Sequence, residues 1–323
     1  MTENSRLRAT WRVVIPLCIW FVVALVAQLG LRRIVVALDI SLPPVFGQFS
    51  VFLIYLPVVL VLLFVAPQLD RRTYADYGLD TSSPVVRNIS AGLGIGVLSS
   101  GIPNLLGIVL GYGAISATFV RGTEQAVIGL IFAVVLAQLA NVFLEEFLYR
   151  GILIQNAAEG ISNWISSRTA SIVGGVIVIS VIFGFSHVIF GGGGGTEGRS
   201  LSLVLTSTLA GLGWGTAYIL TGNLWFPMGI HLGYNLSNAM VFQPNYESVA
   251  FQFPTVFQIG IIHPAFWEIP RSLVSLAVTM ALVVAYIRIV RSEWGIDDRV
   301  APRVQELTGQ RNGNSDPTSE SAE

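Results

Sequence analysis

The sequence predicts an all-α protein, a polytopic membrane bundle of about eight transmembrane helices. Of its 323 residues, 53% are hydrophobic and only 11% are charged, whereas a soluble domain carries about 25% charged residues. The mean hydropathy of +0.69 agrees with this composition. Apolar runs of about 20 residues recur along the chain, and its length accommodates about eight of them with their connections.

The charged residues and the single cysteine narrow the possible functions. The formal net charge is −1, and no basic stripe exists outside short flanks, so we expect no nucleic-acid partner. All 18 cationic residues are arginine, which excludes a Schiff base or a Ser–Lys pair. Cys18 has no second cysteine with which to form an intrachain disulfide.

The N-terminal region, residues 13–123, is expected to hold the first three transmembrane helices after a cytoplasmic head at 1–12. The first apolar run is too long for the core of a signal peptide. A polar segment at 68–87 separates the second span from the third, and its tyrosines and leucines predict a short helix at the membrane surface. The third span is rich in glycine and serine, which favours close helix packing.

The central region, residues 124–243, is expected to hold helices four to seven. The fourth span begins near Glu124 and continues as a helix to about Ala158, so its far end reaches water. Five consecutive glycines, Gly191–Gly195, follow the fifth span. They do not precede a helix with Lys and Ser or Thr, so they predict a flexible connection or a gate rather than a phosphate-binding loop.

The C-terminal region begins with a loop and an eighth helix over 244–291 and ends in a disordered acidic tail over 292–323. The aromatic-rich loop is expected at a membrane interface. Eight spans place both termini on one side, and a cytoplasmic location for them puts most arginines near the span ends inside, as the positive-inside rule requires.

Two adjacent carboxylates, Glu145 and Glu146, follow an apolar run and require an explanation. A single charged side chain at the bilayer centre costs at least about 2.5–3.5 kcal/mol. Glu146 and Arg150 stand four residues apart, in the favourable order for an ion pair on one helix face. Glu145 lies about 100° further round the helix and has no partner in this segment. The unpaired Glu145 is therefore the catalytic candidate, with Glu146 and Arg150 as a supporting pair.

Polar side chains on two further spans are expected to reach the same depth. Glu145 lies about 22 Å before the turn between spans four and five, and His187 about 28 Å after it, at 1.5 Å per residue. His231 and Asn235 are four residues apart on span seven, so they project from one face. A histidine or asparagine in a membrane is usually only a helix-packing residue, but together these positions indicate a site.

The missing motifs limit the chemistry of such a site. There is no His-Glu-x-x-His for a zinc protease, no Gly-x-Ser-Gly for a rhomboid-like serine protease and no Gly-x-Gly-Asp for an aspartyl protease. What remains is a carboxylate and two imidazoles acting on water. Glu145 could be the base, His187 could share that role or bind a metal, and His231 and Asn235 could hold an oxyanion. Glu145, His187 and His231 also match a known zinc ligand set, with water in the fourth place.

At these residues the chain resembles the CPBP family (CAAX protease and bacteriocin-processing, also called Abi) of intramembrane peptidases. That family is marked by Glu-Glu-x-x-x-Arg, Phe-x-x-x-His and His-x-x-x-Asn/Asp on three membrane helices. Here the three motifs are Glu145–Arg150, Phe183–His187 and His231–Asn235. The match covers about Ala126 to Phe242.

The resemblance implies that Glu145 activates water with His187, while His231 and Asn235 stabilise the oxyanion or complete a site for Zn²⁺ or another divalent metal. It implies an endopeptidase of a prokaryotic cell membrane that cleaves membrane-associated or lipid-modified protein substrates. A catalytically silent bacteriocin-immunity or partner-binding protein on the same scaffold is the main alternative. An ion transporter is a weaker one, because the two halves of the chain show no internal repeat.

Overall fold

The computed structural model describes residues 6–39, 44–121, 127–190, 197–245, 254–262, 264–290, 295–301 and 304. Within these ranges the chain is mainly helical, as predicted. The helical elements are α1 (Ala9–Ala37), α2 (Pro44–Asp70), η1 (Ala75–Tyr77), α3 (Val85–Val109), α4 (Val127–Glu145), η2 (Glu146–Ile154), α5 (Gln155–Ile161), α6 (Arg168–Phe190), α7 (Glu197–Thr221), α8 (Trp225–Leu236), η3 (Ser237–Val241) and α9 (Pro264–Val290).

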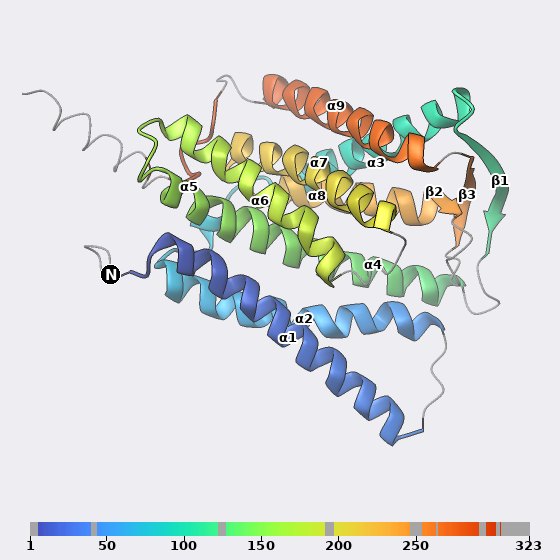
Figure 1. The fold of residues 1–323 in the computed structure, drawn as a ribbon, viewed down its shortest axis with the longest axis horizontal. Coiled ribbons are helices and arrows are strands. Elements are labelled where there is room, and N and C mark those ends of the chain that lie inside the picture. Colours follow the sequence, from blue (N-terminus) through green and yellow to red (C-terminus); the bar gives the residue numbers. More distant parts are fainter. Residues whose placement is uncertain are drawn as a thin grey trace, which may run out of the picture.

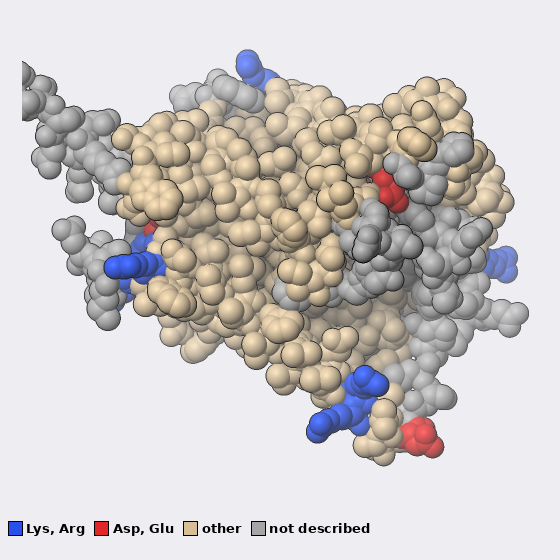
Figure 2. Space-filling model, viewed as in Figure 1, with Lys and Arg blue, Asp and Glu red and all other residues tan. Residues whose placement is uncertain are grey.

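Seven helices of the described chain are long and apolar enough to cross a membrane. The predicted seventh span is the exception, because α8 has only 12 residues before the π-helix η3 extends it. In Figure 1, α1 and α2 form a layer on one side of α4, α6 and α7, and α9 lies on the opposite side. The face shown in Figure 2 carries few charged side chains and has a broad uncharged middle, as a lipid-facing surface requires.

A small sheet closes one end of the bundle, where the sequence predicted only connections. Its strands are β1 (Gly113–Val120), β2 (Phe242–Asn245) and β3 (Thr255–Ile261), in the order β1-β3-β2. β3 pairs antiparallel with β1 and parallel with β2. The predicted aromatic-rich loop thus contains a strand, β3, and its location at a membrane interface stays a prediction. The last helix also begins earlier than predicted, at Pro264, since proline suits the first turn of a helix.

The opposite end of the bundle holds a group of buried charges that we call the basal charge cluster. Its members are Arg6, Arg12, Asp70, Arg72, Asn156 and Glu159. Glu159 accepts hydrogen bonds at 2.7, 2.6 and 2.5 Å from the three arginines. Asn156 donates to Asp70 at 2.9 Å. These contacts tie the N-terminal segment and α2 to α5, the helix that follows the two carboxylates.

Two sequence predictions about this end were wrong. The head at 1–12 is not simply polar, because Arg6 and Arg12 are buried and α1 already begins at Ala9. The segment 68–87 does not form a surface helix but a single 3₁₀ turn, and Tyr77 is fully buried against the cluster. Burial and the neighbouring Asp70 raise the pKa of Tyr77.

Arg72 keeps its charge inside this cluster. Burial disfavours the guanidinium, but Glu159 and Asp70 outweigh burial and raise the pKa of Arg72. The cluster therefore fastens the polar segment to α5 by ion pairs, which would each be costly to break in a buried setting.

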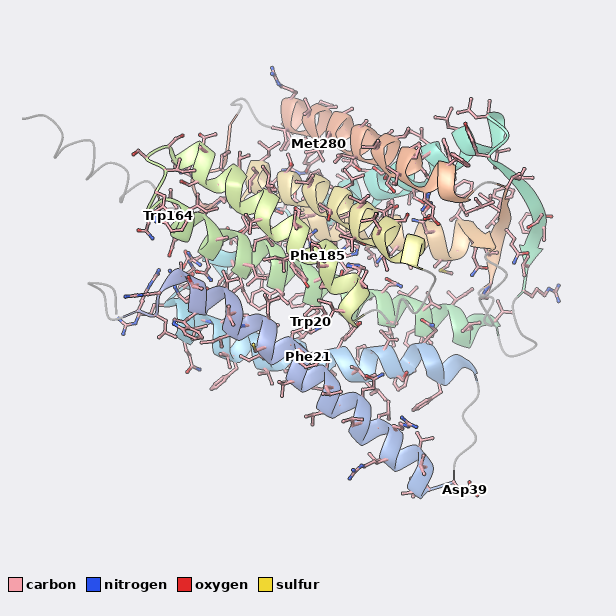
Figure 3. All side chains as sticks on the ribbon, in the orientation of Figure 1. Trp20, Phe21, Asp39, Trp164, Phe185 and Met280 are labelled. Carbon is pink, nitrogen blue, oxygen red and sulfur yellow. The ribbon has the colours of Figure 1, made fainter. Side chains whose placement is uncertain are left out.

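The beginning of the predicted disordered tail is ordered. Within 292–323, residues 295–301 and 304 are described, and Val300, Ala301 and Val304 are fully buried. The Arg299 guanidinium donates to the Thr221 carbonyl at 2.8 Å, which fixes this segment to the turn between α7 and α8. In Figure 1, the beginning of α1 lies at this end of the molecule as well. The exposed Trp164 lies at the same end (Figure 3).

Glycines bring α8 against α3, as the small residues of the third span predicted. A Cβ on Gly92 would lie 2.3 Å from the Phe226 carbonyl oxygen, and one on Gly96 only 2.0 Å from that of Ile230. On α8, a Cβ on Gly233 would likewise lie only 2.2 Å from the Leu93 carbonyl oxygen. Such distances allow no side chain, so the backbones themselves are in contact. α8, which carries His231, is thereby held at a fixed distance from α3.

This contact predicts the effect of one methyl group. We expect Gly96→Ala to destabilise the fold by roughly 1–3 kcal/mol, the usual cost of overpacking. Gly94→Ala is the matched control on the same helix, since a Cβ there meets nothing within 4 Å. Thermal unfolding in detergent should show a lower midpoint for the first variant alone. Equal midpoints for both variants would contradict the close α3–α8 contact.

Candidate active site

The two carboxylates lie where one long helix changes its hydrogen-bonding pattern. The segment Val127–Ile161 is a continuous helix of 35 residues, which confirms that the fourth span continues beyond the motif. It is α-helical to Glu145 and π-helical over Glu146–Ile154. The π-helix is rare, and short π segments occur frequently at functional sites. Here it contains the whole segment from Glu146 to Arg150.

Glu146 connects the two cationic side chains of the site. Arg150 Nε lies 3.3 Å from Glu146 Oε2, which confirms the predicted ion pair. The other oxygen, Oε1, accepts a hydrogen bond of 2.8 Å from Nδ1 of His231. Glu146 is fully buried, and Arg150 and His231 are each 2% exposed. Glu146 is therefore more than a partner of Arg150, because it also joins η2 to α8.

The bond to Glu146 determines which way His231 faces. Because Nδ1 points at the Glu146 carboxylate, it carries the proton and donates it. The other ring nitrogen, Nε2, lies 3.6 Å from Glu145 Oε2. This separation is longer than a hydrogen bond, so the two atoms face each other across a gap. Glu145 and His231 therefore lie close together, whereas the register prediction concerned the depth of Glu145 and His187.

Aromatic rings enclose the charged groups. The Arg150 guanidinium carbon lies 4.5 Å from the centre of the Phe183 ring and 5.3 Å from that of Trp214. Trp214 also stacks on His231, with ring centres 3.8 Å apart and planes inclined by 21°. Trp214 comes from α7, which the sequence motifs do not include. Its indole contacts both Arg150 and His231, and the stacking fixes the plane of the imidazole.

The charges of the site balance with one additional proton. Arg150 is positive, and Glu145 and Glu146 would both be negative when ionised. A buried group with unbalanced charge is strongly disfavoured. Neutrality therefore requires one proton on either Glu145 or His231, and the facing atoms Oε2 and Nε2 are the two places for it.

Several polar atoms of this site have no hydrogen-bond partner among the described residues. Of ten such buried side-chain atoms, five belong to Glu145, Glu146, Tyr149 and Arg150. They include Glu145 Oε2 and both terminal nitrogens of Arg150. Buried polar atoms in native proteins are nearly always paired with protein or water. This concentration of unpaired atoms indicates a place where water or a polar ligand binds.

His187 lies near the site but does not join the carboxylates. Its Nδ1 donates to the Phe183 carbonyl at 2.8 Å, one turn earlier on α6. The imidazole also packs edge-on against the Phe183 ring, at 4.5 Å between centres. Since Nδ1 is the donor, Nε2 keeps a free lone pair. In the described chain no ion pair or hydrogen bond connects His187 with Glu145 or Glu146, so its expected base role stays a prediction.

Asn235 is held by a residue that the motifs do not contain. Its Nδ2 donates to Oε1 of Gln138 at 2.9 Å. Gln138 precedes Glu145 by two helical turns, so both residues lie on one face of α4. A glutamine inside an otherwise apolar run was the available signal for this contact. No sequence signal identified Trp214, because a tryptophan in a membrane helix usually only packs.

The proposed metal ligands do not form a complete set in the described part of the chain. No three His, Cys, Asp or Glu side chains there lie close enough together to hold a metal ion. Nε2 of His231 and Glu145 Oε2 could supply two ligands, and Nε2 of His187 is also left over by its Nδ1 bond, but the three side chains do not come together. We therefore derive no catalytic step through a metal.

The fold and the site together define a polytopic helical membrane protein with a buried carboxylate–imidazole–guanidinium centre. Residues 127–237 match the family model described as "Type II CAAX prenyl endopeptidase Rce1-like". This segment, about a third of the chain, contains all six predicted site residues. Over this segment, the match confirms the resemblance to the CAAX protease (CPBP) family. No curated protein and no solved structure matches the chain.

The buried ion pair predicts a non-additive effect of two substitutions. Arg150→Gln leaves Glu146 with a buried unbalanced charge, and we expect it to cost roughly 3–5 kcal/mol of stability. The double variant Glu146→Gln/Arg150→Gln removes both charges and should recover part of that loss. Thermal or denaturant unfolding of Glu146→Gln, Arg150→Gln and the double variant in one detergent measures the interaction energy between the two side chains. Strict additivity of the two single effects would show that the side chains do not interact.

Proposed function

We propose that this protein is an intramembrane endopeptidase that hydrolyses peptide bonds of membrane-associated or lipid-modified proteins. The main supporting observation is the 3.6 Å approach of Glu145 Oε2 to Nε2 of His231, in a buried site with unpaired polar atoms. A water molecule next to both atoms can be polarised from two sides. The CAAX protease family domain supports proteolysis at the level of the family.

In the proposed reaction, Glu145 is the base that carries the transferred proton, and His231 donates a hydrogen bond from Nε2–H. The water oxygen attacks the peptide carbonyl carbon while Glu145 takes a proton from it. The carbonyl oxygen becomes an oxyanion and accepts a hydrogen bond from Nε2–H of His231. Glu145 then gives its proton to the leaving amide nitrogen as the C–N bond breaks. The products are a carboxylic acid and an amine, and both side chains return to their starting charge.

The remaining residues position this pair. Glu146 orients the imidazole and balances its charge, and Arg150 in turn balances Glu146. Gln138 occupies one N–H of Asn235, so the second N–H of that amide can reach an oxyanion. His187 offers the lone pair of Nε2 as an additional acceptor near the substrate. Trp214 keeps the imidazole plane directed at Glu145.

Replacing the base tests the proposal directly. Glu145→Gln keeps the size of the side chain but cannot accept the proton, so kcat should fall by about 10²–10⁴. The assay follows cleavage of a membrane-anchored peptide by protein reconstituted in vesicles. The control is an unfolding midpoint equal to that of the wild type. Equal cleavage by both proteins would refute the role of Glu145, and cleavage by neither would favour a non-catalytic scaffold.

Metal removal tests whether the side chains alone suffice. Since the described residues gather no three metal ligands, we propose water activation by Glu145 and His231 without a metal. Purified protein should then contain no stoichiometric zinc by elemental analysis, and activity should survive dialysis against a chelator. Stoichiometric metal, together with loss of activity on chelation and recovery on metal addition, would require the metal-bound alternative.

A further inference from the structure

A face of α9 carries polar side chains into the interior of the bundle. Glu268, Ser272, Ser275 and Thr279 follow one another at intervals of four, three and four residues, so they share one face of the helix. The last three are between 4% and 8% exposed. A hydrophilic stripe turned inwards is unusual in a helix whose other faces can meet lipid, because buried polar groups need partners.

Polar residues of three other elements meet this stripe. The hydroxyl oxygens of Thr279 and of Ser99 on α3 lie within hydrogen-bond distance of each other, at 2.9 Å. The Ser202 hydroxyl of α7 donates to Glu268. Arg271 of α9 contacts Asn104 of α3 at 3.4 Å and Asn238 of η3 at 3.5 Å. These contacts connect the sheet end of the molecule with its centre, and we call the set the α9 polar track: Ser99, Asn104, Ser202, Thr206, Asn238, Glu268, Arg271, Ser272, Ser275 and Thr279.

Two small cavities lie along the α9 polar track. The first, of about 10 Å³, lies near the sheet and is lined by Asn104, Arg271 and Trp267, among others. The second, also of about 10 Å³, is lined by Thr206, Ser272, Ser275 and Thr279 together with apolar neighbours. A volume near 10–15 Å³ is about what one water molecule needs, provided that two to four polar groups surround it. Both cavities fulfil these conditions.

The hydroxyl groups around the second cavity can still bind water. Ser272 and Thr279 donate to carbonyl oxygens of their own helix, at 2.9 and 2.8 Å. Thr206 does the same on α7, at 3.2 Å. A hydroxyl that donates one hydrogen bond keeps two lone pairs as acceptors. The cavity therefore offers several acceptors for the two hydrogens of a water molecule.

The second cavity borders the candidate active site. Trp214 and Tyr234 line it, and the Trp214 ring stacks on His231. The Trp214 indole therefore contacts both the cavity and the imidazole that faces Glu145. A peptidase inside a bilayer consumes one water per cleavage, and the surrounding lipid does not supply it.

We propose that the α9 polar track binds water at these two cavities and delivers it past Trp214 to the Glu145–His231 pair. This inference rests on the proposed hydrolytic function. The track begins at the sheet end, opposite the basal charge cluster.

Hydroxyl-radical labelling by short X-ray pulses tests the water sites, because radicals form from water next to the side chains that they modify. In the reconstituted wild type we expect strong labelling of Trp214 and Trp267, which line the cavities although they are only 5% and 6% exposed. Phe226, fully buried and lining neither cavity, is the internal reference. Labelling of both tryptophans no higher than that of Phe226 would overturn the water sites, whether or not the protein cleaves peptides.

A matched pair of variants tests delivery. Thr206→Val/Ser275→Ala removes two hydroxyls of the second cavity, and we expect several-fold weaker labelling of Trp214 and a kcat lower by about tenfold, with KM unchanged. Thr216→Val is the control on α7, since its hydroxyl likewise donates to its own helix but lines neither cavity. Weaker labelling with unchanged kcat would overturn delivery. Reduced kcat with unchanged labelling would also overturn it.

Discussion

The site depends on the two contacts that the carboxylate of Glu146 makes with Arg150 and His231. One oxygen faces Arg150 on the same helix, and the other accepts the hydrogen bond of His231 from α8. Without the hydrogen bond from Nδ1 to Glu146, the imidazole would not be held with Nε2 directed at Glu145. The buried guanidinium would also lack its counter-charge. The bridge is buried in a region of low dielectric, so it is strong only while both partners remain in place.

The rest of the fold supports this bridge from both sides. On one side, the basal charge cluster holds α5, so the long helix from α4 to α5 cannot shift along its axis. On the other side, the glycines let the backbone of α8 pack directly against that of α3. Trp214 completes the support from α7, since its ring lies against His231. Three separate packing arrangements therefore position two atoms, Glu145 Oε2 and His231 Nε2, at a distance that leaves room for reaction.

Much of this arrangement could be predicted from the sequence because its signals are local. Helical periodicity placed Glu146 beside Arg150, and the apolar runs indicated the long helices of the bundle. The sheet was missed because β1 and β3 are far apart in the chain and their pairing leaves no local pattern. The pairing of His231 with Glu146 was also missed, because spacing fixes the face of a helix but not the rotation of its neighbour. The sequence also did not reveal the roles of Trp214, Gln138 and the arginines of the basal charge cluster, because each role depends on a partner on another helix.

The central claim is that His231 donates Nδ1–H to Glu146 and keeps Nε2 for Glu145. It can be measured by ¹⁵N NMR of histidine-labelled protein, since the chain has only three histidines and substitution can assign each signal. The account predicts that Nδ1 of His231 is protonated at neutral pH, and that Glu145→Gln changes the signal of Nε2 but leaves the proton on Nδ1. A His231 whose Nδ1 carries no proton would contradict the account, because Glu146 could not then orient the imidazole.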